Sequence, residues 1–429
     1  MSNLKSYNGR YCESDYENAF IAFLEAEGWQ YLAGDSMTRS SLRDVLYVDG
    51  IEQFLHKTNH DLTTDEVRQI GENVRLAGAE SDFATLHKVY KWMVEGIQFT
   101  PKNGIARMVD LIDFKNDPLK NNIFRVVNQF TVEYTNNGQT ENRRPDVLLY
   151  VNGLPLCVVE LKNPADARAT IFDAWEQINI RYWRDIPHLL HYCPLACISD
   201  GVKTRLGTVR TPYEHFYAWR RVNDGDEVST LPFEETENMV KGVYAPERFL
   251  EIFRDYIYFQ DSIYDSDERE IVCRYPQFFA ARRLKQSIVK SVEEKSGKGG
   301  TYFGATGCGK TYTMAFLARQ LSLRCPEIGS PTIIMIVDRE ELQKQGAKLF
   351  TKSKEFLNLG EVSVVPSRKK LREELGVRES GGFYICTIQK FCDREDDKIG
   401  LINDRANIIC FSDEAHRTQL EHSKAFCTL

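Results

Sequence analysis

Several features that mark other classes of protein are scarce in this 429-residue chain. No stretch reaches the ~18 consecutive uncharged apolar residues of a membrane-spanning helix, and the N-terminus lacks the short apolar run of a signal peptide. The eleven cysteines have no paired spacing, which is typical of free thiols rather than of a disulfide framework. Internal repeats and low-complexity tracts are also lacking. We therefore expect a cytoplasmic protein without disulfides and without a membrane partner.

The chain also has no excess of positive charge, since its net charge is −7. A protein that grips nucleic acid over its whole surface needs clustered Lys and Arg, so any contact with nucleic acid is expected to be local. Acidic residues gather in residues 223–237, which we interpret as an exposed loop or insertion. The length and the 42% of hydrophobic residues indicate a sizeable core and two to three domains.

The spacing of apolar residues changes along the chain. Residues 15–29 have helical spacing, and the short β-rich runs within residues 122–161 predict an antiparallel meander, with a helix following at 165–184. In the last third, short apolar runs alternate with helical stretches, which is typical of a parallel sheet with crossover helices. The predicted fold class is therefore α/β, with a first domain over residues 1–265 and a second over residues 266–429.

The second domain contains a phosphate-binding pattern. Residues 304–311 read GATGCGKT, after the apolar run 301–303, which we expect to be a strand, and before a helix-like stretch. Glycines let backbone N–H groups surround a phosphate, while Lys310 reaches the outer phosphates and the Thr311 hydroxyl holds Mg²⁺. The remaining predicted ATP contacts are Thr306, Gly307, Cys308 and Gly309. A structural glycine-rich turn is the alternative, but it needs neither the lysine nor the hydroxyl at these offsets.

Two carboxylates follow the apolar run IICFS about a hundred residues later. ATP hydrolysis needs metal charge on the phosphates and a positioned water. Asp413 is accordingly predicted to bind Mg²⁺, and Glu414 to orient or deprotonate the attacking water. The alternative for this pair is a solvated helix start.

A second candidate site lies in residues 144–163, which read RPDVLLYVNGLPLCVVELKN. Asp146 enters one strand, and Glu160 and Lys162 lie two residues apart on the next, so they share one face. Phosphodiester hydrolysis uses Mg²⁺ to activate water and a cation to orient it. We predict Asp146 and Glu160 as metal ligands and Lys162 as the catalytic cation, with a charged face on a solvated hairpin as the alternative.

The turn between these two strands decides whether the carboxylates meet. The Asn-Gly dipeptide at 152–153 favours a two-residue turn, but that turn would pair Asp146 with Val159, on the wrong face. A three-residue loop would pair Asp146 with Glu160. We therefore predict a bulged three-residue turn.

GATGCGKT and DEAH, with IVDREELQKQ and CTIQKF between them, resemble motifs I, II, Ia and Ib of superfamily 2 helicase and translocase motors. RYPQ resembles the Q motif, which implies that Gln277 selects ATP. The resemblance also places Arg339 and residues 387–389 near the nucleic-acid path. Motifs III to VI are not found, so it implies an incomplete motor, truncated after the DEAH motif.

The pattern PD-x13-E-L-K-N resembles the PD-(D/E)xK nucleases, and its position before a motor resembles the restriction (R) subunit of type I restriction enzymes. This resemblance implies a mixed-sheet nuclease domain, a RecA-like parallel-sheet domain, ATP-driven movement along double-stranded DNA and Mg²⁺-dependent cleavage. Methylation and specificity subunits are the implied partners.

The resemblance also bears on residues outside the strand pair. It implies a metal-site role for Glu17 and a catalytic role for Gln177, which opens the Q-x-x-x-Y element of that family. Here the fourth residue after Gln177 is Arg181, and Tyr182 comes one later, ~100° further around an α-helix.

Other interpretations remain open. The run HLLHYCPLAC has the residue types of a zinc site, although its spacing is not that of a standard finger: His188, His191, Cys193 and Cys197. For function, the alternatives are a helicase-like ATPase whose N-terminal domain only binds nucleic acid or a partner, and a scaffold for partner subunits.

Overall fold

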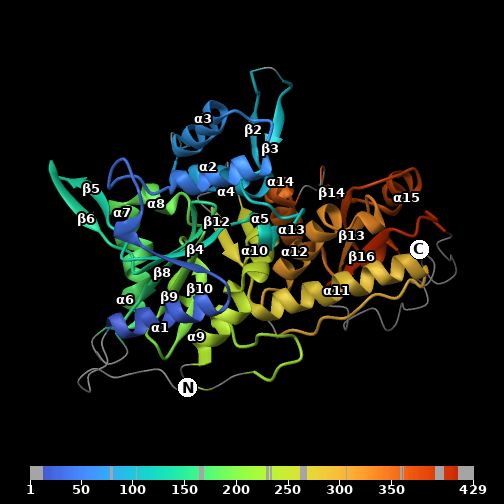
Figure 1. Cartoon of the computed structure of the whole chain (residues 1–429). Helices are drawn as coiled ribbons and strands as arrows, with labels where there is room; N and C mark the ends of the chain where they lie inside the picture. Colours follow the sequence, from blue (N-terminus) through green and yellow to red (C-terminus); the bar gives the residue numbers. More distant parts are fainter. Residues whose placement is uncertain are drawn as a thin grey trace. The chain divides into compact units, whose positions relative to one another are not determined.

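The computed structural model describes residues 13–77, 81–102, 104–163, 169–228, 231, 234–260, 268–305, 307–357, 360, 362–391 and 401–413. The chain forms two compact units (Figure 1). The first comprises Met1–Ile257 and Glu270–Arg274, and the second Tyr258–Arg269 and Tyr275–Leu429. No helix among the described residues is long and apolar enough to cross a membrane.

A six-stranded mixed sheet forms the centre of the first unit, in the order β1-β4-β7-β8-β9-β10. Its strands are β1 (Gln30–Ala33), β4 (Phe124–Asn128), β7 (Val147–Val151), β8 (Leu154–Leu161), β9 (Leu195–Ser199) and β10 (Thr204–Thr208). The expected antiparallel arrangement is confirmed for β4, β7 and β8, while the pairs β1–β4 and β8–β9 are parallel. Every residue of β7, β8 and β9 is buried, as in strands that are covered on both faces.

Helices and smaller hairpins complete the first unit. The helices are α1 (Glu13–Ala26), η1 (Gly34–Ser36), α2 (Val48–Thr58), α3 (Thr64–Arg75), α4 (Asp82–Glu95), α5 (Pro118–Asn121), α6 (Ile171–Glu176), η2 (Gln177–Tyr182), α7 (Trp183–Asp185), α8 (Pro187–Leu190), η3 (Tyr213–His215), α9 (Glu234–Met239), η4 (Val240–Tyr244) and α10 (Pro246–Asp255). Two hairpins, β2 (Ile97–Phe99) with β3 (Arg107–Val109) and β5 (Val132–Asn136) with β6 (Gln139–Arg143), extend away from the central sheet in Figure 1. Two further strands are β11 (Ile257–Gln260), which falls largely in the second unit, and β12 (Arg269–Val272), which falls largely in the first.

Two expectations about helices need correction. The segment 223–237 is not an exposed loop throughout, because its last residues begin α9, where Thr236 is buried. The single helix expected over 165–184 contains a π-helical turn, η2, between α6 and α7, and residues 164–168 lie outside the described part of the chain.

The turn between β7 and β8 is also different from the prediction. Residues 152–153 form a two-residue turn, with φ of +52° at Asn152 and +85° at Gly153, and Val151 pairs with Leu154. Contacts with neighbouring segments explain this, because buried Asn152 accepts a hydrogen bond from the Ile123 N–H at 2.8 Å. The extra residue forms a β-bulge further along β8, since Leu149 pairs with Cys157 although Tyr150 pairs with Pro155.

The second unit has a four-stranded parallel sheet in the order β14-β15-β13-β16. Its strands are β13 (Thr332–Val337), β14 (Val362–Val364), β15 (Phe383–Thr387) and β16 (Ile408–Ser412), and its helices are α11 (Tyr275–Glu294), α12 (Lys310–Leu323), η5 (Pro326–Ile328), α13 (Glu340–Lys352), α14 (Lys354–Leu357), α15 (Arg368–Gly376) and η6 (Ile388–Lys390). The strand expected at 301–303 is absent from the described sheet, and Phe303 is 95% exposed. Glycines at both ends of this run disfavour a strand, because glycine loses more backbone entropy than other residues and has no side chain to pack.

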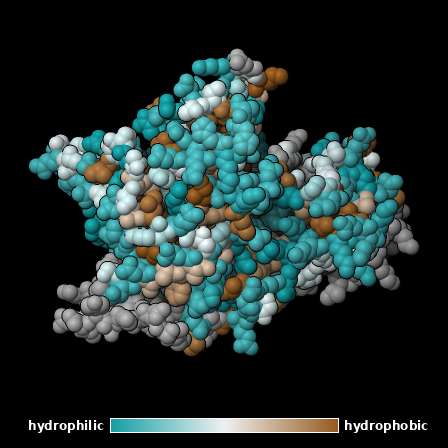
Figure 2. Space-filling view, viewed as in Figure 1, coloured by the Kyte–Doolittle hydropathy of each residue, from teal (hydrophilic) through white to brown (hydrophobic). Residues whose placement is uncertain are grey.

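The face of the molecule in Figure 2 is mostly hydrophilic, and hydrophobic residues appear there as scattered spots. Isolated exposed apolar residues are normal on a protein surface and need no functional explanation.

Candidate functional site

The first unit brings together the residues predicted around the PD and ELK motifs. Asp146 immediately precedes β7, Glu160 lies near the end of β8, and Lys162 follows that strand. Gln177 and Tyr182 begin and end the π-helix η2. All five side chains belong to one hydrogen-bonded or electrostatically coupled cluster.

The bulge in β8 restores the register that aligns the two carboxylates. Val147 pairs with Val159, so extending the ladder by one residue places Asp146 opposite Glu160. The Oδ2 atom of Asp146 accepts the Leu161 N–H at 2.8 Å, which holds the carboxylate at the end of β8. The predicted pairing of the carboxylates thus forms, although by a bulge within the strand rather than by a longer turn.

Three donors surround the Glu160 carboxylate, which is fully buried. Lys162 Nζ lies 3.3 Å from Oε1, Gln177 Nε2 donates to the same oxygen, and the Tyr182 hydroxyl donates to Oε2 at 2.9 Å. Lys162 Nζ also donates to Gln177 Oε1 at 2.9 Å. Because each donor is tied to another, the carboxylate and the ammonium group hold one fixed arrangement.

Burial has the largest effect on the pKa values of Glu160 and Tyr182 in this cluster. Burial, and then the neighbouring charge of Asp146, raise the pKa of the Glu160 carboxyl well above its usual value. The Lys162 charge and the Tyr182 hydroxyl act against this rise. Burial and the Glu160 charge likewise raise the pKa of the Tyr182 hydroxyl, so it stays protonated and donates. Two adjacent carboxylates, one of them Glu160 with its raised pKa, are a site that a cation would stabilise.

The position of Tyr182 cannot be predicted from α-helical geometry. In an α-helix, residues five apart point in directions about 140° apart. In η2 the helix has the i→i+5 pattern of a π-helix, which is frequent at functional sites. Gln177 Nε2 therefore lies 2.9 Å from the Tyr182 hydroxyl, and both reach Glu160. The extra residue between the glutamine and the tyrosine is accommodated within the helix.

The donor set fits Mg²⁺. Mg²⁺ prefers oxygen ligands and is commonly held by one or two carboxylates, with water and substrate phosphate completing its coordination. Asp146 and Glu160 supply two such carboxylates side by side. In the part of the chain that the structure describes, no three His, Cys, Asp or Glu side chains converge as a metal cluster, and the metal-site role of Glu17 stays a prediction.

Glu17 lies on α1 and bonds two side-chain amides. It is buried, and its two oxygens accept hydrogen bonds from Asn128 Nδ2 and Gln129 Nε2, each at 2.6 Å. The Gln129 N–H donates to the Asp146 carbonyl at 3.0 Å. No sequence pattern identified these two amides as partners of Glu17, because they lie far from α1 in the chain.

The residues of the zinc alternative form no metal cluster among the described residues. His191 Nε2 lies 2.8 Å from Asp82 Oδ1, and burial raises the pKa of the Cys193 and Cys197 thiols, that of Cys197 to about 12. Buried thiols of raised pKa behave as apolar side chains rather than as thiolate ligands.

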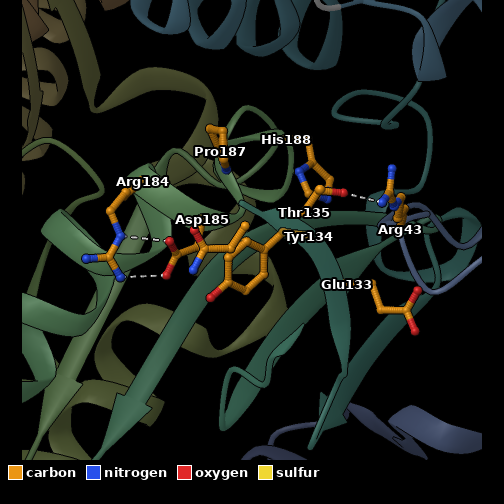
Figure 3. A pocket seen from close by; sticks show the side chains of 9 residues that line it. Arg43, Glu133, Tyr134, Thr135, Arg184, Asp185, Pro187 and His188 are labelled. Atoms are coloured by element: carbon orange, nitrogen blue, oxygen red, sulfur yellow. Dashed lines mark hydrogen bonds and ion pairs between the residues drawn. The ribbon is translucent and has the colours of Figure 1, made fainter. Parts of the chain in front are cut away.

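A separate cavity of about 510 Å³ lies beside the β5–β6 hairpin (Figure 3). Arg184 forms an ion pair with Asp185, and Arg43 donates to Thr135 at its opposite side. None of the five clustered residues lines it; its lining consists of Arg43, Glu133, Tyr134, Thr135, Asn136, Arg184, Asp185, Pro187 and His188.

In the second unit, the phosphate-binding pattern opens α12. Gly307 and Gly309 have φ of +77° and +84°, the left-handed region that glycine adopts readily. Lys310 begins the helix, and its Nζ donates to the Gly304 carbonyl at 3.3 Å. Thr311 is the second residue of α12, whereas Thr306 lies outside the described residues.

Gln277 lies against this loop. It is buried on α11, and its Nε2 donates to the carbonyls of Gly309 at 3.0 Å and Cys308 at 3.4 Å. The sequence-based prediction assigned it to ATP, and the structure places it beside the predicted phosphate site.

The other motifs of the second unit lie at the ends of its strands. Asp413 follows β16 and donates its N–H to the Ile336 carbonyl at 2.9 Å, while Glu414 lies outside the described residues. Gln389 Nε2 donates to the Asp338 carbonyl at 3.0 Å, next to Arg339. Carboxyl ends of parallel strands are the usual position of ligand sites in such sheets.

Comparisons with known proteins match two parts of the chain to two families. Residues 10–215 match the family "Type I restriction enzyme R protein N terminus", and residues 276–427 match the family "SWI2/SNF2 ATPase". The chain thus joins a restriction-enzyme N-terminal region to an ATPase region. These matches support an N-terminal region of a type I restriction enzyme R protein, as the sequence motifs indicated.

Individual relatives carry the same description. The type I restriction enzyme HindI endonuclease subunit of Haemophilus influenzae is 31% identical over 95% of this chain and 39% of that protein. The MjaIXP endonuclease subunit of Methanocaldococcus jannaschii is 29% identical over 94% of this chain and 39% of that protein. The chain thus spans about two fifths of these curated relatives. A solved HsdR fragment from Vibrio vulnificus YJ016 is 15% identical over 70% of this chain and 48% of that chain, with a TM-score of 0.21.

Proposed function

We propose that this chain contains the Mg²⁺-dependent nuclease domain and the first RecA-like ATPase domain of a type I restriction endonuclease subunit. The nuclease domain corresponds to residues 1–265 and the ATPase domain to 266–429. The full protein would move double-stranded DNA by ATP hydrolysis and cleave it, together with methylation and specificity subunits. The observation that carries the proposal is the cluster of Asp146, Lys162, Gln177 and Tyr182 around the buried Glu160 carboxylate.

Each residue of that cluster has a defined part in the proposed cleavage. Asp146 and Glu160 would hold Mg²⁺, and the bound ion would lower the pKa of water and shield the phosphate. Lys162 Nζ, fixed by Glu160 and Gln177, would orient the attacking water and stabilise charge on the phosphate. Tyr182 would keep Glu160 in position and favour its ionised form.

The ATPase part of the proposal rests on the loop at the start of α12. Backbone N–H groups of residues 306–309 and the Lys310 ammonium would bind the phosphates of ATP, with Thr311 and Asp413 as Mg²⁺ ligands. Glu414 would position the attacking water, and Gln277 would read the adenine base. An anion would compete with the Gly304 carbonyl for Lys310.

The test is cleavage of circular DNA by the full-length protein assembled with its partner subunits, with Mg²⁺ and ATP. Asp146→Ala is expected to end cleavage while ATP hydrolysis continues, because only the nuclease metal is lost. A helicase-like ATPase with a non-catalytic N-terminal domain would show no Mg²⁺-dependent cleavage in the wild type either. Cleavage by Asp146→Ala at the wild-type rate would contradict the proposal.

A further inference from the structure

The π-helix η2 is tethered to a short segment that follows β10. Three side chains on the continuous helix, spaced four residues apart, donate hydrogen bonds to only two backbone carbonyls. Trp175 Nε1 donates to the Thr211 carbonyl at 2.9 Å, and Trp183 Nε1 donates to the Val209 carbonyl at 2.7 Å. Asn179 Nδ2 donates to both, at 2.9 Å to Val209 and 3.1 Å to Thr211.

Asn179 is the member of this set that lies inside the π turn, between Gln177 and Tyr182. A π turn is rare and appears mostly as a single turn within α-helices, so contacts outside the helix are needed to favour it. Without the wider turn, Gln177 and Tyr182 would point in directions about 140° apart, and only one could reach Glu160. The hydrogen bonds of Asn179 therefore help to fix the positions of both Gln177 and Tyr182.

The accepting segment is itself anchored. The Thr208 N–H donates to Thr211 Oγ1 at 2.8 Å, and Thr208 Oγ1 donates to the Glu270 carbonyl at 3.1 Å. Thr208 and Thr211 are both buried. The two carbonyls are consequently held in place by β10 and β12, and the helix is fixed against them.

We propose that Asn179 is a positioning residue of the nuclease site, which holds the π turn so that Gln177 and Tyr182 both contact Glu160. This inference rests on the proposed nuclease function. It has a specific consequence, because the π turn accommodates one residue more than an α-helical turn. Deletion of Ile180, whose side chain is 47% exposed, would let an ordinary α-helix place Gln177 and Tyr182 four residues apart on one face. Asn179 would then no longer be needed.

The experiment compares four variants of the full-length protein assembled with its partner subunits: Asn179→Ala, deletion of Ile180, both together, and Ile180→Ala as the control. Asn179→Ala is expected to lower the cleavage rate constant about 10- to 100-fold, as loss of a supporting residue or a 1 Å misplacement does. The KM for DNA and ATP hydrolysis should be unchanged. Amide hydrogen exchange over residues 177–183 should be faster. Ile180→Ala should cleave at the wild-type rate.

The role of Asn179 is decided by whether deletion of Ile180 restores cleavage to the Asn179→Ala variant. The deletion is expected to cleave within a few-fold of the wild type, and the double variant to match the deletion. If the double variant is as slow as Asn179→Ala, or if Asn179→Ala cleaves normally, the inference is wrong. A deletion variant that does not fold leaves Asn179→Ala as the deciding variant, through its amide exchange and its unchanged KM. Failure of the wild type to cleave with Mg²⁺, or normal cleavage by Glu160→Gln, would instead overturn the proposed function.

Discussion

The two candidate sites differ in how far the protein alone assembles them. In the first unit, the side chains around the buried Glu160 carboxylate contact one another, and their hydrogen bonds hold them in place without a ligand. In the second unit, Lys310 donates to a loop carbonyl and Gln277 to two others, while Asp413 is placed at the end of β16. A site built on strands and packed helices is preorganised, whereas one built on a glycine loop takes its geometry from the phosphates. Substitutions should therefore act differently at the two sites.

The largest expected effect is at Glu160. Glu160→Gln removes one of two metal carboxylates while keeping the size of the side chain. Cleavage by the assembled enzyme should fall by about 100-fold or more, the upper range for loss of a residue that supports a metal ligand. ATP hydrolysis should persist, as measured by phosphate release. Cleavage by Glu160→Gln at the wild-type rate would contradict the account of the site in the first unit.

Lys310→Ala should instead reduce ATP hydrolysis and leave metal binding in the first unit unchanged. The ammonium group is a point charge on the outer phosphates, and its loss should reduce ATP hydrolysis about 100-fold or more. Metal binding at Asp146 and Glu160 should be unchanged in a calorimetric titration, since those residues form their own cluster within the first unit. A loss of metal affinity in Lys310→Ala would show that the two sites are not built independently.

A smaller effect is expected from Tyr182→Phe, which removes only the hydroxyl. The raised pKa of Glu160 means that protons compete with the metal, so Mg²⁺ affinity should increase as the pH rises through that pKa. The Tyr182 hydroxyl favours the ionised carboxylate, so its loss should raise the pKa of Glu160 further. The acid limb of the Mg²⁺-binding profile should move to higher pH, and cleavage should fall about 10-fold. An unchanged profile would remove Tyr182 from the site.

The smallest effects concern two Asn-Gly turns with the same backbone. Gly153 and Gly138 both have positive φ, +85° and +80°. A Cβ at Gly153 would lie 2.1 Å from the Tyr47 carbonyl oxygen, whereas none of the surrounding atoms lies within 4 Å of one at Gly138. Gly153→Ala should therefore lower the free energy of unfolding by about 1–3 kcal/mol more than Gly138→Ala, as measured by denaturant titration. Equal losses would mean that packing against Tyr47 does not fix the turn.

The same elements show what the sequence can and cannot predict. The PD and ELK motifs with strand alternation named Asp146, Glu160 and Lys162, and the glycine loop named the start of α12. Gln177 came only from the resemblance to the nuclease family, and Tyr182 did not fit the spacing of that family's motif. The turn was predicted wrongly, because the contacts of Asn152 with Ile123 depend on a distant segment. The π turn could not be predicted either, since the carbonyls that accept from Asn179 come from the connection after β10. Local patterns identified the chemistry, and tertiary contacts decided the geometry.

The central claim is that Asp146 and Glu160 form one metal site, prepared by the fold before DNA arrives. The most direct measurement is a calorimetric titration of Mn²⁺, as a probe for Mg²⁺, into the full-length protein without DNA or nucleotide. The wild type and Lys310→Ala should show the same binding event in the first unit, and Asp146→Asn and Glu160→Gln should each lose it. Binding that survives both carboxylate substitutions, or that disappears in Lys310→Ala, would contradict the account.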